Sequence, residues 1–140
     1  MKKVIKSLKD VPINGYLIIA VIALYCLNRF LLKEHTTGWV NYLLRCHFDD
    51  TICGTLIVAY SNVFLNVGNR AMIRLIAIVP FCFCVGLIWE FAAPLVRKGT
   101  TPDWIDVGCY VLGGILYWGI FMLCSRIDKK QNKKDDVSSE

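Results

Sequence analysis

Residues 75–96 read LIAIVPFCFCVGLIWEFAAPLV, and Glu90 is the only charged side chain among them. An α-helix needs about 20 predominantly apolar residues to cross the hydrocarbon core of a bilayer, and this stretch is long enough. In lipid every backbone polar group must be hydrogen-bonded within the protein, so a spanning segment is either a helix or part of a closed barrel. Because the stretch does not alternate apolar and polar residues as a barrel strand does, it predicts a membrane-spanning helix.

The composition of the whole chain also indicates a membrane protein. Hydrophobic residues make up 56% of the 140 residues and charged residues 19%, whereas soluble domains contain about 45–50% apolar and about 25% charged residues. This excess excludes a disordered chain and argues against a soluble enzyme of this size. Three further apolar runs lie near residues 13–32, 52–68 and 104–124. The sequence therefore predicts an all-α, polytopic membrane protein, with a bundle of four transmembrane helices over residues 1–127 and a charged cytoplasmic tail over residues 128–140.

A short amphipathic segment separates the first two predicted spans. In the stretch 38–48, which reads GWVNYLLRCHF, the side chains of Trp39, Tyr42, Leu43 and Cys46 recur at helical spacing. This pattern predicts a short helix that lies in the outer membrane interface with its apolar face toward the lipid. The alternative is an irregular loop whose aromatic side chains anchor it at the level of the headgroups.

The net charge of +5 is distributed as membrane topology requires. Lysines precede the first span and basic residues follow the last one, and no helix carries a basic stripe interleaved with aromatic residues, which excludes a nucleic-acid-binding surface. Cytoplasmic loops are enriched in Lys and Arg, and placing both termini inside also puts Arg70 and Arg74 inside. We therefore expect a multi-pass protein of the plasma membrane with both termini cytoplasmic. Its first span is expected to be retained, because no small-residue cleavage site follows it.

This orientation brings carboxylates to the outer ends of the spans. Glu90 has apolar neighbours on both sides, and a carboxylate within a membrane helix costs a few kcal/mol unless it faces water or a partner. Two interpretations follow. Glu90 is a ligand, metal or proton site, or it is a side chain that snorkels outward or is hydrogen-bonded to a neighbouring helix.

Two aspartates open the last predicted span. Asp103 is placed to cap the helix. Asp106 lies one turn into the helix and shares a face with Tyr110, Gly113 and Tyr117, because residues three, four or seven positions apart lie on one side of a helix. Glycines on that face let another helix approach closely. The sequence thus predicts that Asp106 and Tyr110 face the interior of the bundle.

The second predicted span also begins with two acids, Asp49 and Asp50, and it is interrupted by Asn62 and Asn66. One of the two aspartates is predicted to be an N-cap, and the other to be free, with His47, to join a site. Asn62 is expected to form a hydrogen bond across helices, because an amide in a membrane helix requires a partner.

Acids from three spans are thus expected at one level, in a shared, water-accessible pocket. Carboxylates that lie close together repel one another, and the repulsion is relieved by protonation, by a divalent cation, by a cationic ligand or by salt bridges to Arg29, Arg97 and Lys98. No residue spacing in the sequence matches a dedicated metal-binding motif. The acids could bind a divalent cation, but the sequence does not favour this outcome, and it assigns no metal ligand and no cofactor. The seven cysteines form no C-x-x-C pair and are interpreted as small apolar side chains. The candidate ligand-binding residues are Asp49, Asp50, Glu90, Asp103, Asp106 and Tyr110.

The stretch 89–114 contains a spaced pattern of acids and glycines: a glutamate late in one span, a loop glycine, two aspartates that open the last span, and a glycine pair two turns on. In this pattern the chain resembles the VanZ-like family of small membrane proteins. It departs from the family at Ala93, Thr100 and Tyr110, where glutamine, arginine and asparagine are common. The resemblance implies a bacterial plasma-membrane protein, and some members of the family raise resistance to the glycopeptide teicoplanin. The matching residues are Glu90, Gly99, Asp103, Asp106, Gly113 and Gly114.

Three functional hypotheses follow from these features. The leading one is a non-catalytic protein of the cell envelope, whose outward-facing acidic pocket binds a lipid headgroup, a cation or the cationic part of an envelope ligand that is itself lipid-linked. The alternative is a membrane-embedded enzyme that acts on a lipid or polyprenyl-phosphate, with Glu90 or Asp106 as the catalytic candidate, alone or with a divalent metal. The third is a transporter with Glu90 as its proton site.

Overall fold

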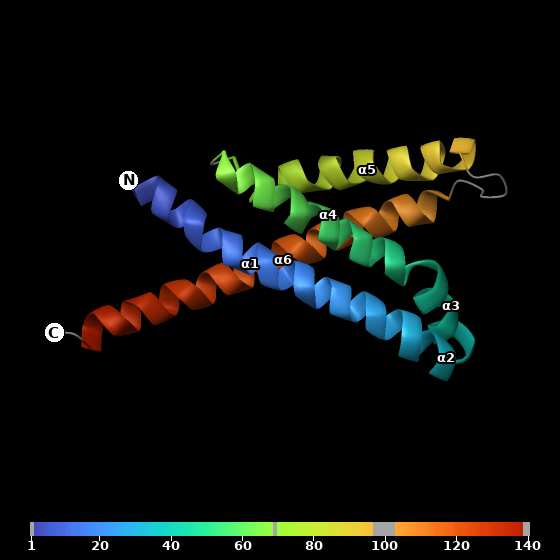
Figure 1. Ribbon diagram of the computed structural model, residues 1–140, viewed down its shortest axis with the longest axis horizontal. Helices are drawn as coiled ribbons and strands as arrows, with labels where there is room; N and C mark the ends of the chain where they lie inside the picture. The colour runs from blue at the N-terminus through green and yellow to red at the C-terminus, as the bar shows by residue number, and fades with distance from the viewer. Residues whose placement is uncertain (1, 69, 97–102, 139–140) are drawn as a thin grey trace.

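The computed structural model describes residues 2–68, 70–96 and 103–138, and every secondary-structure element in this part of the chain is helical (Figure 1). The elements are, in chain order, α1 (Lys2–Leu27), η1 (Asn28–Leu32), α2 (Lys33–His35), α3 (Gly38–Cys46), α4 (Phe48–Val67), α5 (Leu75–Val96) and α6 (Trp104–Ser138). The first helix continues without a break through the π-helical stretch η1 into α2. The prediction of an all-α protein is confirmed.

Three helical segments are long and apolar enough to cross a membrane, namely Ile13–His35, Leu75–Ala92 and Trp104–Ile127. They correspond to the first, third and fourth predicted spans. The predicted second span, residues 52–68, lies in α4 up to Val67 but is not among these three segments. The fold is therefore that of a helical protein with three candidate membrane-spanning helices.

Two predicted boundaries differ from the observed ones. The apolar part of the first helix extends past residue 32 to His35, and the last helix continues through the predicted tail to Ser138. Residues 128–138 contain neither glycine nor proline, so no residue in the tail terminates the helix. The segment between the first two predicted spans is helical over α3, which begins at Gly38 with a positive φ of 69°.

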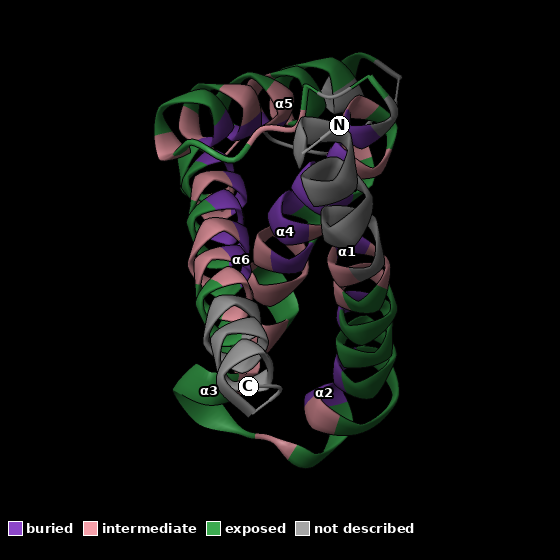
Figure 2. Ribbon diagram, turned by 90° about the vertical axis from the view of Figure 1, so that its left-hand side faces the viewer, coloured by how far each residue is buried: buried purple, intermediate pink, exposed green. Residues whose placement is uncertain are grey.

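The long helices are arranged in the order α1, α4, α6 and α5. α4 packs against α1 on one side and against α6 on the other, and α5 packs mainly against α6 (Figures 1 and 2). The start of α1, the end of α6 and the α4–α5 connection lie at one end of the bundle. The opposite end, where α3 lies, α4 and α6 begin and α5 ends, is called the α3 end below. All candidate acids belong to the α3 end.

Glycines allow α6 to approach its neighbours closely. A Cβ atom on Gly113 would overlap the carbonyl oxygen of Thr51 in α4, and one on Gly54 would overlap the carbonyl oxygen of Tyr110 in α6. On the side of α5, a Cβ atom on Gly114 would meet the Cys82 sulfur at 2.5 Å. The predicted close approach at the glycine pair is therefore confirmed, and it involves both neighbouring helices.

A buried polar network joins three helices nearer the other end of the bundle. The Tyr117 hydroxyl donates a hydrogen bond to Asn14 Oδ1 at 2.6 Å and accepts one from Asn62 Nδ2 at 2.8 Å. Asn62 also donates to the carbonyl oxygen of Met72 and accepts from its N–H, at 3.0 and 2.7 Å. The predicted cross-helix hydrogen bond of Asn62 is confirmed. The network ties α1, α4, α6 and the α4–α5 connection together.

The glycine contacts lead to a test of the α4–α6 packing. We expect Gly113→Ala to lower the free energy of unfolding by about 1–3 kcal/mol, the usual cost of an overpacked contact, because the added methyl group forces α4 and α6 apart. Gly119→Ala is the matched control, since nothing lies within 4 Å of a Cβ atom there. It should leave the stability unchanged or raise it by up to about 1 kcal/mol, the difference in helix propensity. Denaturant unfolding in detergent micelles measures both, and equal values would contradict the packing argument.

Candidate functional site

The structure brings the candidate acids to a single end of the bundle. Asp49 and Asp50 lie in the first turn of α4, and Glu90 lies in the last two turns of α5. Asp103 directly precedes α6, and Asp106 lies in its first turn. The side chains nevertheless have different partners, so they do not form one continuous cluster.

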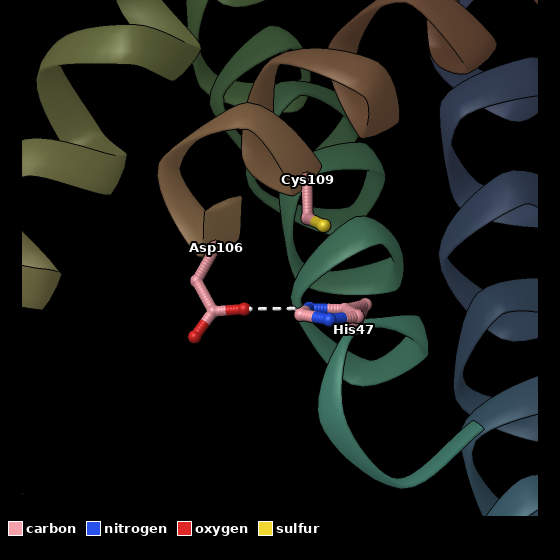
Figure 3. A group of neighbouring side chains, drawn as sticks. All are labelled: His47, Asp106 and Cys109. Carbon is pink, nitrogen blue, oxygen red and sulfur yellow. Dashed lines mark hydrogen bonds and ion pairs between the residues drawn. The ribbon is translucent and has the colours of Figure 1, made fainter. Parts of the chain in front are cut away.

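Asp106 is paired with His47. The two side chains are joined by a hydrogen bond of 2.9 Å between His47 Nδ1 and Asp106 Oδ1, and both are partly buried, with exposed side-chain fractions of 15% for His47 and 21% for Asp106. His47 is the residue between α3 and α4 and occupies the N-cap position of α4. The pair therefore fixes the start of α4 against the start of α6, which are far apart in the sequence (Figure 3).

Asp49 is engaged in a separate interaction. Its carboxylate accepts hydrogen bonds from Lys33 Nζ at 2.7 Å and from Asn28 Nδ2 at 2.8 Å. The charge of Asp49 is thus neutralised by a buried lysine from the end of the first helix. The prediction that Asp49 or Asp50 is the N-cap residue of α4 is wrong. His47 occupies the N-cap position, and its side chain makes no capping hydrogen bond. Asp49 instead ties η1 and α2 to α4.

This partner of Asp49 differs from the ones that the sequence suggested. From the sequence, the cations expected to relieve the repulsion are Arg29, Arg97 and Lys98. Arg29 is exposed, and the other two lie outside the described residues. Lys33 comes into reach because the π-helical stretch η1 changes the rotation of the helix before α2.

Asp103 and Glu90 meet at the start of α6. Asp103 Oδ1 accepts a hydrogen bond of 2.9 Å from the N–H of Ile105, so its predicted capping role is confirmed. The backbone N–H of Asp103 donates a hydrogen bond to the Glu90 carboxylate. The carboxylate of Glu90 is therefore held at the N-terminus of α6, where the helix dipole favours negative charge.

Asp50 faces a cavity of about 560 Å³. Most of the cavity wall is apolar and comes from α1, α4 and α5, with Tyr110 as the contribution of α6. Burial, followed by the neighbouring carboxylates of Asp106, Glu90 and Asp49, raises the pKa of Asp50 to about 6, whereas His47 opposes the shift. The lining residues include Ile18, Ile22, Leu56, Ile57, Trp89 and Tyr110.

The inward face that was predicted for α6 is confirmed. Tyr110 and Tyr117 are almost completely buried, Gly113 is buried between them, and Asp106 is half-buried at the start of the helix. Tyr110 lines the same cavity as Asp50, so two of the predicted ligand-binding residues share one site. The other acids are occupied by Lys33, His47 and backbone N–H groups.

Besides Lys33, Cys109 is a residue of this end whose position the sequence did not predict. All seven cysteines are free, and Cys82 is the only one that is buried, so the interpretation as packed apolar side chains holds for Cys82 alone. Cys109 lies one turn after Asp106, and its sulfur is directed toward His47 (Figure 3). The spacing of an aspartate and a cysteine three residues apart was the available signal. This spacing indicates a group of possible ligands only once the structure places His47 next to Asp106 and Cys109.

Comparisons with protein-family models, with curated proteins and with solved structures find no match to this chain.

The raised pKa of Asp50 leads to a prediction about stability. Because the folded state binds this proton more tightly than the unfolded chain, the carboxyl group destabilises the fold as it ionises between pH 3.8 and about 6. We expect the free energy of unfolding of the wild type, relative to that of Asp50→Asn, to fall as the pH rises through this range. Glu34→Gln, at an exposed acid of α2, is the control and should parallel the wild type. Denaturant titrations at several pH values measure the difference, and a constant difference would contradict the assignment.

Proposed function

We propose that this chain is a four-span protein of the cell envelope that binds the amine-bearing headgroup of a lipid beside Asp50. The observation that carries the proposal is the cavity itself, in which apolar side chains of membrane helices surround a single carboxylate. Lipid-binding sites are typically concave and mostly apolar, with a few polar groups that fix the orientation of the ligand.

The position of α4 supports a fourth span. This helix lies between α1 and α6, and both of its neighbours contain candidate spans. Its asparagines are buried in the bundle, whereas Tyr60 and Phe64 are exposed on its other face, as a lipid-facing surface requires. We therefore count the predicted segment 52–68 as a span despite its lower hydropathy, with Asp50 just outside it in the first turn of α4. α3, with exposed Trp39 and Tyr42, is proposed to lie in the membrane interface.

The ends of the bundle support an orientation. The N-terminal part of α1, the C-terminal part of α6 and the α4–α5 connection share one end (Figure 1). The sequence of these segments contains Lys2, Lys3, Lys6, Lys9, Arg70, Arg74, Arg126, Lys129, Lys130, Lys133 and Lys134. Basic segments stay in the cytoplasm. We propose that both termini are cytoplasmic, that the protein resides in the plasma membrane, and that the α3 end faces outward.

The chemistry of the cavity indicates the ligand. Ile22, Tyr60 and Trp89 line the cavity and are also exposed at the surface of the bundle, so an acyl chain reaches the cavity sideways from the bilayer. No cation lies within ion-pair distance of Asp50 among the described residues. An ammonium group supplies the missing positive charge, and a charge-assisted hydrogen bond is shorter and stronger than a neutral one. A lipid with a primary amine, such as phosphatidylethanolamine, provides both parts.

The resemblance to the VanZ-like family agrees with this proposal. The residues that carry it are the acids at the ends of α5 and α6 and the glycine pair Gly113–Gly114. The acids hold the α3 end together and the glycines set the packing of α6, so the pattern describes a scaffold around the cavity. We propose a binding role in the envelope for this scaffold.

Lipid retention tests the binding proposal. We expect Ile22→Trp to reduce the amount of phosphatidylethanolamine that stays bound during purification, because the indole fills the cavity. Leu24→Trp is the matched control, since Leu24 is 46% exposed and Ile22 49%, and Leu24 does not line the cavity. Native mass spectrometry of the protein from mixed-lipid vesicles counts the bound lipids. Equal retention by the two variants would contradict the proposed site.

The headgroup is tested separately from the cavity. Asp50→Asn removes the charge, so we expect at least a tenfold loss in affinity for phosphatidylethanolamine, which corresponds to about 1.4 kcal/mol, and no loss for phosphatidylglycerol. Glu34→Gln should change neither affinity. If the wild type binds both lipids equally, the amine is not the recognised group.

Cysteine labelling tests the orientation. In a cysteine-free chain to which only Cys46 is restored, we expect a membrane-impermeant maleimide to label intact cells, because Cys46 is exposed in α3. The same chain with Arg70→Cys instead, in the α4–α5 connection, should be labelled only after the cells are permeabilised. The reverse result would overturn the proposed topology.

A further inference from the structure

Three potential ligand atoms of different chemistry converge at the α3 end. A nitrogen of the His47 imidazole, a carboxylate oxygen of Asp106 and the sulfur of Cys109 all lie within 4.8 Å of one another. Figure 3 shows Asp106 and Cys109 extending from the first turns of α6 toward the His47 ring, which comes from the start of α4. All three residues are half-buried, so the group is accessible to solvent but its side chains are held by the surrounding helices.

The donor set matches one class of metal ion. Nitrogen, oxygen and sulfur together suit a borderline-soft divalent ion, of which zinc is the commonest in proteins. Zinc bonds of about 2.0–2.3 Å at tetrahedral angles place neighbouring ligand atoms about 3.5 Å apart. The three donors lie at most 4.8 Å apart, so their largest separation exceeds that spacing by no more than about 1.3 Å. Asp106 and Cys109, at positions i and i+3 of one helix, already lie on the same face.

The surroundings favour a cation at this point. Asp50 and Glu90 both interact electrostatically with Asp106, so the local field is negative. The Thr51 hydroxyl donates a hydrogen bond of 3.0 Å to the carbonyl oxygen of His47 and lies beside the Cys109 thiol. Such outer contacts fix the orientation of metal ligands. Partial exposure leaves room for water to complete the coordination.

We propose that His47, Asp106 and Cys109 form a three-ligand binding site for a zinc-class divalent ion, with water in the fourth position. The ion links the start of α4 to the start of α6 in place of the direct hydrogen bond between His47 and Asp106. The site is separate from the lipid cavity, which uses other residues, so each proposal stands or falls without the other.

Cobalt substitution tests the ligand set in the full chain. We expect Co²⁺ to bind the purified protein in detergent micelles with a thiolate-to-metal charge-transfer band in the near ultraviolet, and Zn²⁺ to displace it. His47→Gln, Asp106→Asn and Cys109→Ser should each weaken Zn²⁺ binding at least tenfold in isothermal titration calorimetry, because even outer-shell changes cost about 10–100-fold. The matched controls are His35→Gln and Cys46→Ser, at an exposed histidine and an exposed cysteine of the same end, and both should bind as the wild type does.

A second measurement needs no variant, so it does not depend on how the substitutions fold. Zn²⁺ should slow the reaction of Cys109 with maleimide in the wild type at least tenfold, whereas the exposed Cys46 should react at an unchanged rate; peptide mass spectrometry separates the two thiols. The proposal is overturned if Cys109 is not protected, or if Co²⁺ gives no thiolate band. It is also overturned if the control variants lose Zn²⁺ as the ligand variants do. His47 and Asp106 would then be a hydrogen-bonded pair only.

Discussion

The close contact between α4 and α6 is the constraint on which the rest of the molecule depends. It exists because Gly54 and Gly113 carry no side chain where the two backbones meet. In a membrane, apolar side chains gain little by leaving lipid for protein, so helices associate through close packing and polar contacts. The glycines supply the first of these and bring the polar groups of the two helices within reach of each other. His47 and Tyr110 occupy their positions in the site because of this contact.

Polar contacts then hold the same pair of helices along their length. The Asn62–Tyr117 hydrogen bond lies on one side of the glycine contact, and the His47–Asp106 pair lies on the other. Between them the Thr55 hydroxyl donates to the carbonyl oxygen of Gly113 at 2.8 Å. The buried Thr55 and Asn62 side chains of α4 each form a hydrogen bond with α6, because a polar group in a low-dielectric environment requires a partner. Both side chains thus lie on the face of α4 that packs against α6.

The sequence was sufficient for features that depend on one helix at a time. The apolar run 75–96, the capping role of Asp103 and the inward face that contains Tyr110 all follow from spacing within a segment, and all three are observed. The partner of Asp49 did not follow, because the position of Lys33 depends on a π-helical stretch that has no clear sequence signature. Cys109 was missed for a related reason. Its neighbours in sequence are apolar, and its polar neighbours come from α4.

The acids at the α3 end have different partners, and this explains why they do not share the single pocket that the sequence predicts. Five carboxylates at one level repel one another, and the fold relieves most of that repulsion locally. Lys33 neutralises Asp49, His47 pairs with Asp106, and Glu90 accepts the N–H at the start of α6. Asp50 alone faces an apolar cavity, where burial and the other carboxylates raise its pKa to about 6. A charge that the fold does not neutralise costs stability unless a ligand neutralises it. Among these five carboxylates, Asp50 thus has no cation within ion-pair distance in the described part of the chain, and it lies beside an apolar cavity.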